Sequence, residues 1–356
     1  MPVTDADHHG RAWLGDYGHG HERHGAVLVS SYLAEYLKPF DPLFQDPTVI
    51  EVVINGDGQC YVERQGLSQM VRAADHDITP QAAKDIAQQS ANESAVALTE
   101  KAPLLSTSVE HAGKMLRVQA VIPPASASGT VLSFRIFRPG DTGEPRTFSF
   151  LRDDVTASQD EERTRKLRHI EGIARVGSVN DFLKEVLRLE LNIVIAGGTS
   201  TGKTELGRRM LYLIPDHERL VTIEDSSELR PRQPNVVSLI TDRSPASPRT
   251  AEKLLRATLR LRPDRIIVGE LRGSEAATFL EAINTGHGGS FTTLHAQTAR
   301  KAMDRLALMV MGTGTQLQYA EVMRYLQATI DLVIQAGRVG NARGIVEIYV
   351  PPLDAL

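Results

Sequence analysis

The chain has 356 residues, which is long enough for two or three domains that each bury a sizeable core. Its hydrophobic content of 41% and charged content of 24% are ordinary for a globular protein, and its net charge of −4 argues against a broadly basic nucleic-acid-binding surface. The single cysteine, Cys60, excludes an internal disulfide framework and a zinc site built from cysteines, and it suits a reducing compartment.

The chain begins with a polar, histidine-containing segment over residues 1–25. We expect a disordered tail, because histidine clusters are common at flexible chain ends; a metal-binding tract is the alternative. The segment lacks the apolar region of a signal peptide, and no apolar stretch in the chain approaches about 18 residues. We therefore expect a cytoplasmic protein whose membrane association, if any, is peripheral.

Residues 26–138 are predicted to form an N-terminal α+β domain. Apolar stripes at helical spacing predict two helices, the second capped by Thr79, and β-branched runs predict four strands. A turn of asparagine, aspartate and glycine between the first two strands is typical of a hairpin. The first predicted helix has its apolar stripe within residues 32–37 and ends near Pro39, the second covers residues 79–98, and the predicted strands cover residues 49–54, 59–64, 115–122 and 130–137.

A connector follows over residues 139–177. Prolines and glycines break regular structure at its start, and residues 153–168 carry a dense run of both charges with few apolar side chains. This composition indicates a solvated linker or a surface helix. The connector is longer than a typical loop, which favours independent movement of the domains that it joins.

Residues 178–356 are predicted to form an α/β domain whose first helix is capped by Ser178, with Asp181 in the capping-box position. Short apolar runs then alternate with segments of helical spacing, and polar residues follow the runs at the edge where open α/β sheets bind ligands. The predicted strands cover residues 191–196, 220–223, 265–268 and 290–294; the helices cover 203–214, 250–261, 274–284, 298–311 and 318–329; and a closing hairpin joins 331–335 to 345–350.

The strongest motif fits the phosphate-binding pattern G-x-x-x-x-G-K-[ST] and lies between a predicted strand and a predicted helix, which is the context that the pattern requires. We expect backbone N–H groups of this loop to bind the phosphates of ATP. Lys203 should contact the β- and γ-phosphates, and the Thr204 hydroxyl should bind Mg²⁺. The loop consists of Gly197, Gly198, Thr199, Ser200, Thr201, Gly202, Lys203 and Thr204.

Two further strand ends supply carboxylates to the same edge. Glu270 follows the strand 265–268, where a carboxylate would polarise the water that attacks the γ-phosphate; capping of the next element is its alternative role. Gly269 precedes it in place of the aspartate of a common Walker B motif. The acidic ligands of Mg²⁺ are therefore predicted to be Glu224 and Asp225.

Two histidines accompany the strand 290–294. His295 ends this strand at the active edge, and we predict that it senses the γ-phosphate, although a lone histidine is most often structural. His287 lies in the glycine-rich turn 285–289. For His287, a functional role and a role in shaping the turn both stay open.

These motifs together carry a family resemblance. The segments 197–204, 222–229, 269–273 and 285–296 resemble the Walker A, Asp box, Walker B and His box of the secretion ATPase superfamily. Over about residues 30–350 the chain is similar to the VirB11 family of type IV secretion and conjugation. It departs from the family at Ser200 and Thr201, where Gly-Ser is frequent, and in its histidine-containing start.

The resemblance implies an α/β fold in which an N-terminal α+β domain is joined by a long linker to a RecA-like P-loop NTPase domain. It also implies a homohexameric ring, with nucleotide bound between the two domains and the linker packing neighbouring subunits. Arg117 and Arg135 match the arginines of the N-terminal domain that contact the phosphates, a role that suits a guanidinium group. With Lys203, Glu270 and His295 they form the expected catalytic set.

The expected function is a Mg²⁺-dependent motor ATPase that drives type IV secretion or conjugative transfer from the cytoplasmic side of the inner membrane. Its expected partners are copies of itself and the other inner-membrane and ATPase components of the machine, without stable direct binding of DNA. The alternatives are a type II secretion or type IV pilus motor, and a nucleotide-regulated scaffold with negligible turnover. A DNA-translocating helicase is disfavoured, because no basic stripe with interleaved aromatic residues is found.

Overall fold

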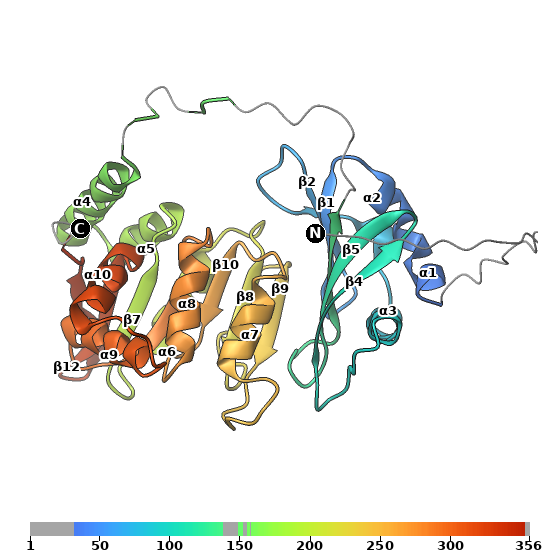
Figure 1. Cartoon of the computed structure of the whole chain (residues 1–356). Coiled ribbons are helices and arrows are strands. Elements are labelled where there is room, and N and C mark those ends of the chain that lie inside the picture. Colours follow the sequence, from blue (N-terminus) through green and yellow to red (C-terminus); the bar gives the residue numbers. More distant parts are fainter. Residues whose placement is uncertain (1–31, 138–148, 152–154, 157, 353–356) are drawn as a thin grey trace, which may run out of the picture. The chain divides into compact units, whose positions relative to one another are not determined.

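The computed structural model describes residues 32–137, 149–151, 155–156 and 158–352 (Figure 1). The histidine-containing tail predicted over residues 1–25 lies outside the described residues, as does part of the connector predicted over 139–177. Within the described part of the chain, no helix is both long and apolar enough to cross a lipid bilayer.

The N-terminal region is built on an antiparallel six-stranded sheet in the order β3-β2-β1-β6-β5-β4. Its predicted hairpin is present, since β1 pairs with β2 and places Ile54 opposite Cys60. The strands are β1 (Val49–Ile54), β2 (Cys60–Arg64), β3 (Val71–Arg72), β4 (Leu104–His111), β5 (Lys114–Val121) and β6 (Val131–Phe137).

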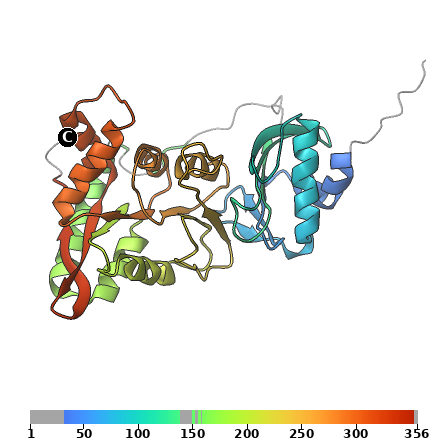
Figure 2. The ribbon, with the colours of Figure 1, turned by 90° about the horizontal axis from the view of Figure 1, so that it is seen from below.

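Helices cover one face of this sheet and enclose its core. The predicted cap of the longest helix is present, because the Thr79 hydroxyl accepts a hydrogen bond of 3.1 Å from the N–H of Ala82. Figure 2 shows this helix, drawn in cyan, against one face of the sheet. Ile86 of that helix, Phe44 and Phe134 are fully buried in one apolar cluster. The helices are α1 (Tyr32–Leu37), α2 (Asp41–Gln45) and α3 (Pro80–Glu93), with 3₁₀ turns at Lys38–Phe40 and Ala74–His76.

The described end of the predicted connector is a helix, α4 (Gln159–Val176). Leu167 and Ile170 are buried against the next helix and the sheet behind it. The Arg163 guanidinium binds Asp331 at 2.6 Å and donates to two backbone carbonyls beside it. The connector therefore ends in a helix that is docked on the second sheet, which goes beyond the solvated linker or surface helix that we predicted.

The second sheet has seven strands in the order β13-β12-β7-β11-β10-β8-β9. All neighbouring strands are parallel except β12 and β13, which form the predicted closing hairpin. The strands are β7 (Ile193–Gly197), β8 (Leu220–Glu224), β9 (Val236–Ile240), β10 (Arg265–Val268), β11 (Phe291–His295), β12 (Leu332–Val339) and β13 (Ala342–Tyr349).

Helices cover both faces of this sheet, and the side chains of β7 show why. Val194 and Ala196 point into a core shared with α7 to α10, whereas Ile193 and Ile195 point into a core shared with α4 to α6. The remaining helices are α5 (Val179–Arg188), α6 (Lys203–Leu213), α7 (Ala251–Thr258), α8 (Glu275–Asn284), α9 (Ala299–Met311) and α10 (Tyr319–Thr329) (Figure 1).

Backbone and side-chain bonds tie the two sheets together. The loop between β5 and β6 pairs with β9: Ala127 donates to the carbonyl of Ser238 at 2.9 Å, and Ile240 donates to the carbonyl of Ala125 at 2.8 Å. The fully buried Arg219 donates through Nη1 to Asn55, which directly follows β1, and to Asn235, which directly precedes β9. These contacts are formed within one chain and bypass the connector.

Candidate functional site

Polar groups lie at the carboxyl ends of four parallel strands, along one edge of the second sheet. The neighbouring strands are β7, β11, β10 and β8. β7 leads into the predicted phosphate loop, β11 ends at His295, β10 is followed closely by Glu270, and β8 ends at Glu224. A cleft of about 880 Å³ opens at this edge, and its lining includes Lys203, Thr204 and all three of those residues. The structure thus brings together the predicted residues of the second domain, at the carboxyl edge where α/β sheets bind ligands.

The phosphate loop has the backbone geometry of a tight anion cradle. Gly202 has φ +97°, the left-handed region that favours glycine, and it directly precedes α6. A Cβ atom on Gly197 would lie 2.5 Å from the Thr201 hydroxyl and 2.7 Å from the carbonyl of Ala336, so only glycine fits there. The loop therefore places its backbone and the N-terminus of α6 beside the cleft, an arrangement that is typical of anion-binding loops.

Lys203 is held at the base of this cradle. It is only 9% exposed, and its ammonium group donates to the carbonyls of Gly197 at 3.1 Å and Gly198 at 2.8 Å. Burial lowers the pKa of Lys203, while the charge of Glu270 acts in the opposite direction. The ammonium group thus binds backbone oxygens at the position where the predicted phosphate oxygens would lie.

His295 joins Lys203 to Glu270. Its Nδ1 lies 3.4 Å from the Lys203 ammonium, and its Nε2 lies 3.3 Å from Oε1 of Glu270. A neutral ring with its proton on Nε2 satisfies both contacts, because Nδ1 then accepts from the lysine and Nε2 donates to the carboxylate. His295 also faces Gly197 in the β7–β11 register, which explains why these groups meet.

The second oxygen of Glu270 is bound by an arginine that we did not predict. Arg272 donates to Oε2 of Glu270 at 2.7 Å and also lies 3.6 Å from Asp225. The only signal in the sequence was its place two residues after Glu270. Arg272 extends the chain of contacts from Lys203 through His295 and Glu270 toward the acidic side of the cleft.

The two predicted acidic ligands of Mg²⁺ have different surroundings. Glu224 accepts backbone hydrogen bonds from Glu228 at 3.1 Å and Leu229 at 2.9 Å, and burial raises its pKa. Asp225 accepts from Thr241 at 2.8 Å and pairs with Arg243. Burial acts to raise the pKa of Asp225, but these hydrogen bonds outweigh it and the pKa is lowered.

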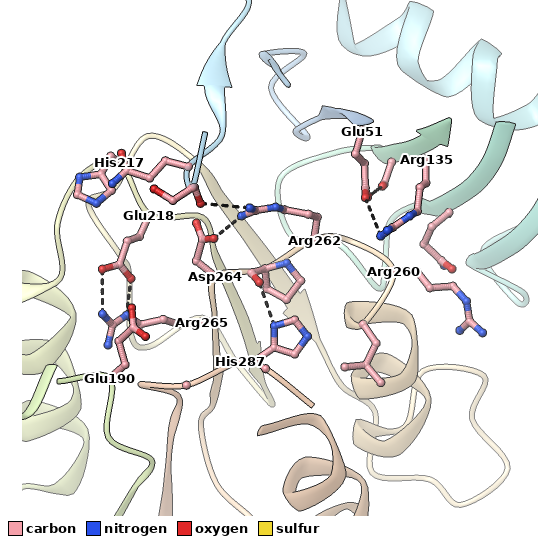
Figure 3. A pocket seen from close by; sticks show the side chains of 18 of the residues that line it. Glu51, Arg135, Glu190, His217, Glu218, Arg260, Arg262, Asp264, Arg265 and His287 are labelled. Carbon is pink, nitrogen blue, oxygen red and sulfur yellow. Dashed lines mark hydrogen bonds and ion pairs between the residues drawn. The ribbon is translucent and has the colours of Figure 1, made fainter. Parts of the chain in front are cut away.

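Three other candidates lie outside this cleft. His287, Arg117 and Arg135 line a second pocket on a different side of the sheet (Figure 3). His287 shares a hydrogen bond of 3.1 Å with the carbonyl of Pro263, and burial lowers its pKa. Arg117 and Arg135 are both exposed, and neither lies among the residues that line the cleft of Lys203.

Comparisons with known proteins identify relatives along most of the chain. Residues 163–339 match the family model described as "Type II/IV secretion system protein". The type IV secretion system protein VirB11 of Bartonella quintana is 33% identical over 332 residues, which cover 89% of this chain and 92% of the relative. The conjugal transfer protein TrbB of Rhizobium radiobacter is 33% identical over 307 residues, covering 85% of this chain and 84% of the relative.

A solved structure is similar over the same extent. The crystal structure of the VirB11 ATPase from the Brucella suis type IV secretion system, in complex with sulphate, aligns with a TM-score of 0.78 and 31% identity. The alignment covers 89% of this chain and 94% of that chain.

Proposed function

Because the chain belongs to the VirB11 family of type IV secretion ATPases, we propose that it binds ATP and Mg²⁺ at the cleft of Lys203 and works as a homohexameric motor of a type IV secretion or conjugative transfer machine. The observation that supports this proposal most directly is the meeting of Lys203, His295 and Glu270 at one sheet edge. A lysine, a histidine and a carboxylate around a glycine cradle suit hydrolysis of a phosphoanhydride.

In the proposed reaction, the ammonium group of Lys203 moves from the loop carbonyls to the β- and γ-phosphates of ATP. That movement releases the His295 ring from the lysine, so the ring can rotate and donate its Nε2 proton to a γ-phosphate oxygen in place of Glu270. Glu270 orients the attacking water, and Arg272 holds the carboxylate in place from its other oxygen. The acceleration comes from positioning and from stabilisation of charge, as phosphoryl transfer requires.

The cleft also suits Mg²⁺. Hydroxyl and carboxylate oxygens are the protein ligands that this ion prefers, and Thr204, Glu224 and Asp225 all line the cleft. Within the described ranges, no group of three or more acidic, histidine or cysteine side chains forms a metal site on its own. We therefore expect the ion to share its coordination with phosphate oxygens, where it would neutralise their charge.

The names of the relatives support the cellular part of the proposal. They describe type IV secretion and conjugal transfer proteins, so we propose the other inner-membrane and ATPase components of such a machine as partners. We further propose a peripheral location on the cytoplasmic side of the inner membrane, without stable direct binding of DNA. A type II secretion or pilus motor is less well supported by these relatives.

Release of phosphate from ATP by the purified chain tests the proposal. Lys203→Ala should abolish Mg²⁺-dependent turnover, whereas Lys184→Ala, which removes an exposed lysine on α5, should leave it unchanged. Normal turnover in a folded Lys203→Ala protein would refute the site. Nucleotide binding without turnover in the wild type would instead favour the scaffold, and turnover that depends on DNA would favour the helicase.

A further inference from the structure

Glu270 is held by two kinds of contact, some to its carboxylate and others to the backbone beside it. The carboxylate contacts His295 and Arg272, as described above. The backbone at Glu270 has already left the parallel ladder, because β10 ends at Val268. The position of this carboxylate therefore also depends on what holds the residues on either side of it.

The residue before Glu270 is bound by both neighbouring strands. The N–H of Gly269 donates to the carbonyl of Ile223 on β8 at 2.8 Å. The carbonyl of Gly269 accepts a hydrogen bond of 2.6 Å from the hydroxyl group of Thr293 on β11. A Cβ atom on Gly269 would lie 3.2 Å from Cγ of Glu224, which is closer than side chains ordinarily pack, so a glycine suits this position.

The residue after Glu270 is held by the same threonine. The N–H of Leu271 donates to the backbone carbonyl of Thr293 at 3.0 Å, and the Leu271 side chain is buried in the apolar core of the sheet. Thr293 is itself buried and lines the cleft of Lys203. It thus contacts both neighbours of Glu270, one through its hydroxyl group and the other through its carbonyl group.

The adjacent threonine of β11 has no such contact. Thr292 points to the opposite face of the strand and is fully buried, and within the described ranges its hydroxyl group makes one long hydrogen bond of 3.4 Å, to the carbonyl of the next residue. Thr293 shares its face of the strand with His295, two residues later. One face of β11 therefore fixes Glu270 twice, at the backbone through Thr293 and at the carboxylate through His295.

We propose that Thr293 is a positioning residue for ATP hydrolysis, whose hydroxyl group keeps Glu270 within reach of the attacking water. The proposal rests on the proposed function, because Thr293 acts through Glu270 and takes no part in the chemistry itself. A base must lie within hydrogen-bond distance of the group it activates, and a displacement of about 1 Å can cost about 100-fold in rate. Without the hydroxyl group, the Gly269 carbonyl turns toward water in the cleft to find a donor, and the peptide that leads into Glu270 moves with it.

Replacement of the hydroxyl group by a methyl group tests this role. Thr293→Val should lower the turnover number for ATP by about 10- to 100-fold, with the dissociation constant of a fluorescent ATP analogue unchanged. Thr293→Ser keeps the hydroxyl group and should restore most of the turnover. Thr222→Val is the matched control on β8, because Thr222 is fully buried and its hydroxyl group has no hydrogen-bond partner in the described part of the chain; it should keep wild-type turnover.

A double variant separates a role through Glu270 from a general structural role. Once Glu270→Gln has removed the carboxylate, Thr293→Val should cause little further loss, as measured by single-turnover hydrolysis of ATP. Two independent losses would instead multiply. Multiplied losses would overturn the proposal, because Thr293 would then act on hydrolysis by another route.

Three other results would also overturn it. Full turnover in Thr293→Val would show that the hydroxyl group is not needed, and so would equal losses in Thr293→Val and Thr293→Ser. Loss of analogue binding in Thr293→Val would show that Thr293 shapes the whole cleft and does not position one group. Failure of the proposed function would look different, because the wild type would show no turnover, or Glu270→Gln would turn over normally.

Discussion

We predict that the docking of α4 on the second sheet depends on one buried ion pair. The free-energy cost of breaking this pair can be derived from its surroundings. Arg163 is 17% exposed and Asp331 is 10% exposed, and the guanidinium also donates to the carbonyls of Gln327 and Ile330. Arg163→Ala leaves the Asp331 carboxylate with one remaining donor, the N–H of Asn192 at 2.8 Å. Breaking one side of a buried pair costs about 3 kcal/mol or more, because the remaining charge stays buried.

That cost should appear as local opening of α4. At about 1.4 kcal/mol for each factor of ten, a loss of about 3 kcal/mol lowers the protection of its amides by roughly 100-fold. Hydrogen exchange measured by mass spectrometry on peptides from residues 159–176 reports this change directly. Lys166→Ala is the control on the same helix, because Lys166 makes an exposed pair with Glu162 at 3.6 Å that is worth only about 0.3–0.5 kcal/mol.

Equal protection of α4 in the Arg163 and Lys166 variants would refute the reasoning. It would mean that the buried faces of Leu167 and Ile170 hold the helix without the ion pair. Loss of protection throughout the second sheet in the Arg163 variant would also contradict it, because the effect would then be global unfolding and not undocking of one helix.

Three further predictions concern catalysis and pH. Glu270→Gln keeps the shape of the side chain but removes its charge, so ATP should still bind while turnover falls by about 100-fold or more; a collapse of nucleotide affinity with normal turnover would make Glu270 structural. His295→Ala should lower turnover by about 100-fold with little effect on binding, as measured by phosphate release and by titration with labelled nucleotide; unchanged turnover would rule out its sensing role. The hydrogen bond from Arg64, with those from Thr48, lowers the pKa of Asp46 to about 2 from its usual 3.8, so its contribution to stability is present above pH ~4 and is lost as the pH falls toward 2. The difference in thermal midpoint between Asp46→Asn and the wild type should therefore shrink between pH 6 and pH 3, and a difference that stays constant would show that ionisation of Asp46 is not its source.

The second sheet was predictable from the sequence because its strands are continuous apolar runs and its motifs have fixed spacing. The strand that ends at Gly197 and the strand ends at Glu270 and His295 were predicted within one or two residues. The expected fold class is confirmed by the solved VirB11 structure, and the family assignment by the curated relatives. The domain boundary at residue 178 and the roles of the site residues stay predictions.

Three strands were missed: β3 (Val71–Arg72), which has only two residues, and two longer strands that were missed for different physical reasons. β4 (Leu104–His111) is rich in serine and threonine. Its sequence therefore shows only a weak alternation of apolar and polar residues, although buried and exposed positions do alternate in the structure. β9 (Val236–Ile240) follows a proline-containing segment and lies at an edge of its sheet, where only Val237 and Leu239 are buried. In each case the strand is stabilised by pairing with its neighbour, and the local sequence does not reveal that pairing.

Local sequence patterns could not predict contacts between segments that are distant in the chain. Arg163 and Asp331 are 168 residues apart, and the charge run around Arg163 reads equally well as a solvated surface. Arg117 and Arg135 line a pocket that has walls from both sheets, and the local sequence does not show that they lie there and not at the cleft of Lys203.

The pairing of the β5–β6 loop with β9 has a consequence for handling this protein in pieces. Ala125 and Ala127 occupy backbone groups on the outer edge of the seven-stranded sheet, and Val121, Ala125 and Val131 share a core with Val237. An ATPase fragment that starts at residue 178 would expose this unpaired edge together with the apolar side chains beneath it. Such an edge is a template for strand addition, so the fragment should self-associate into aggregates that the intact chain avoids.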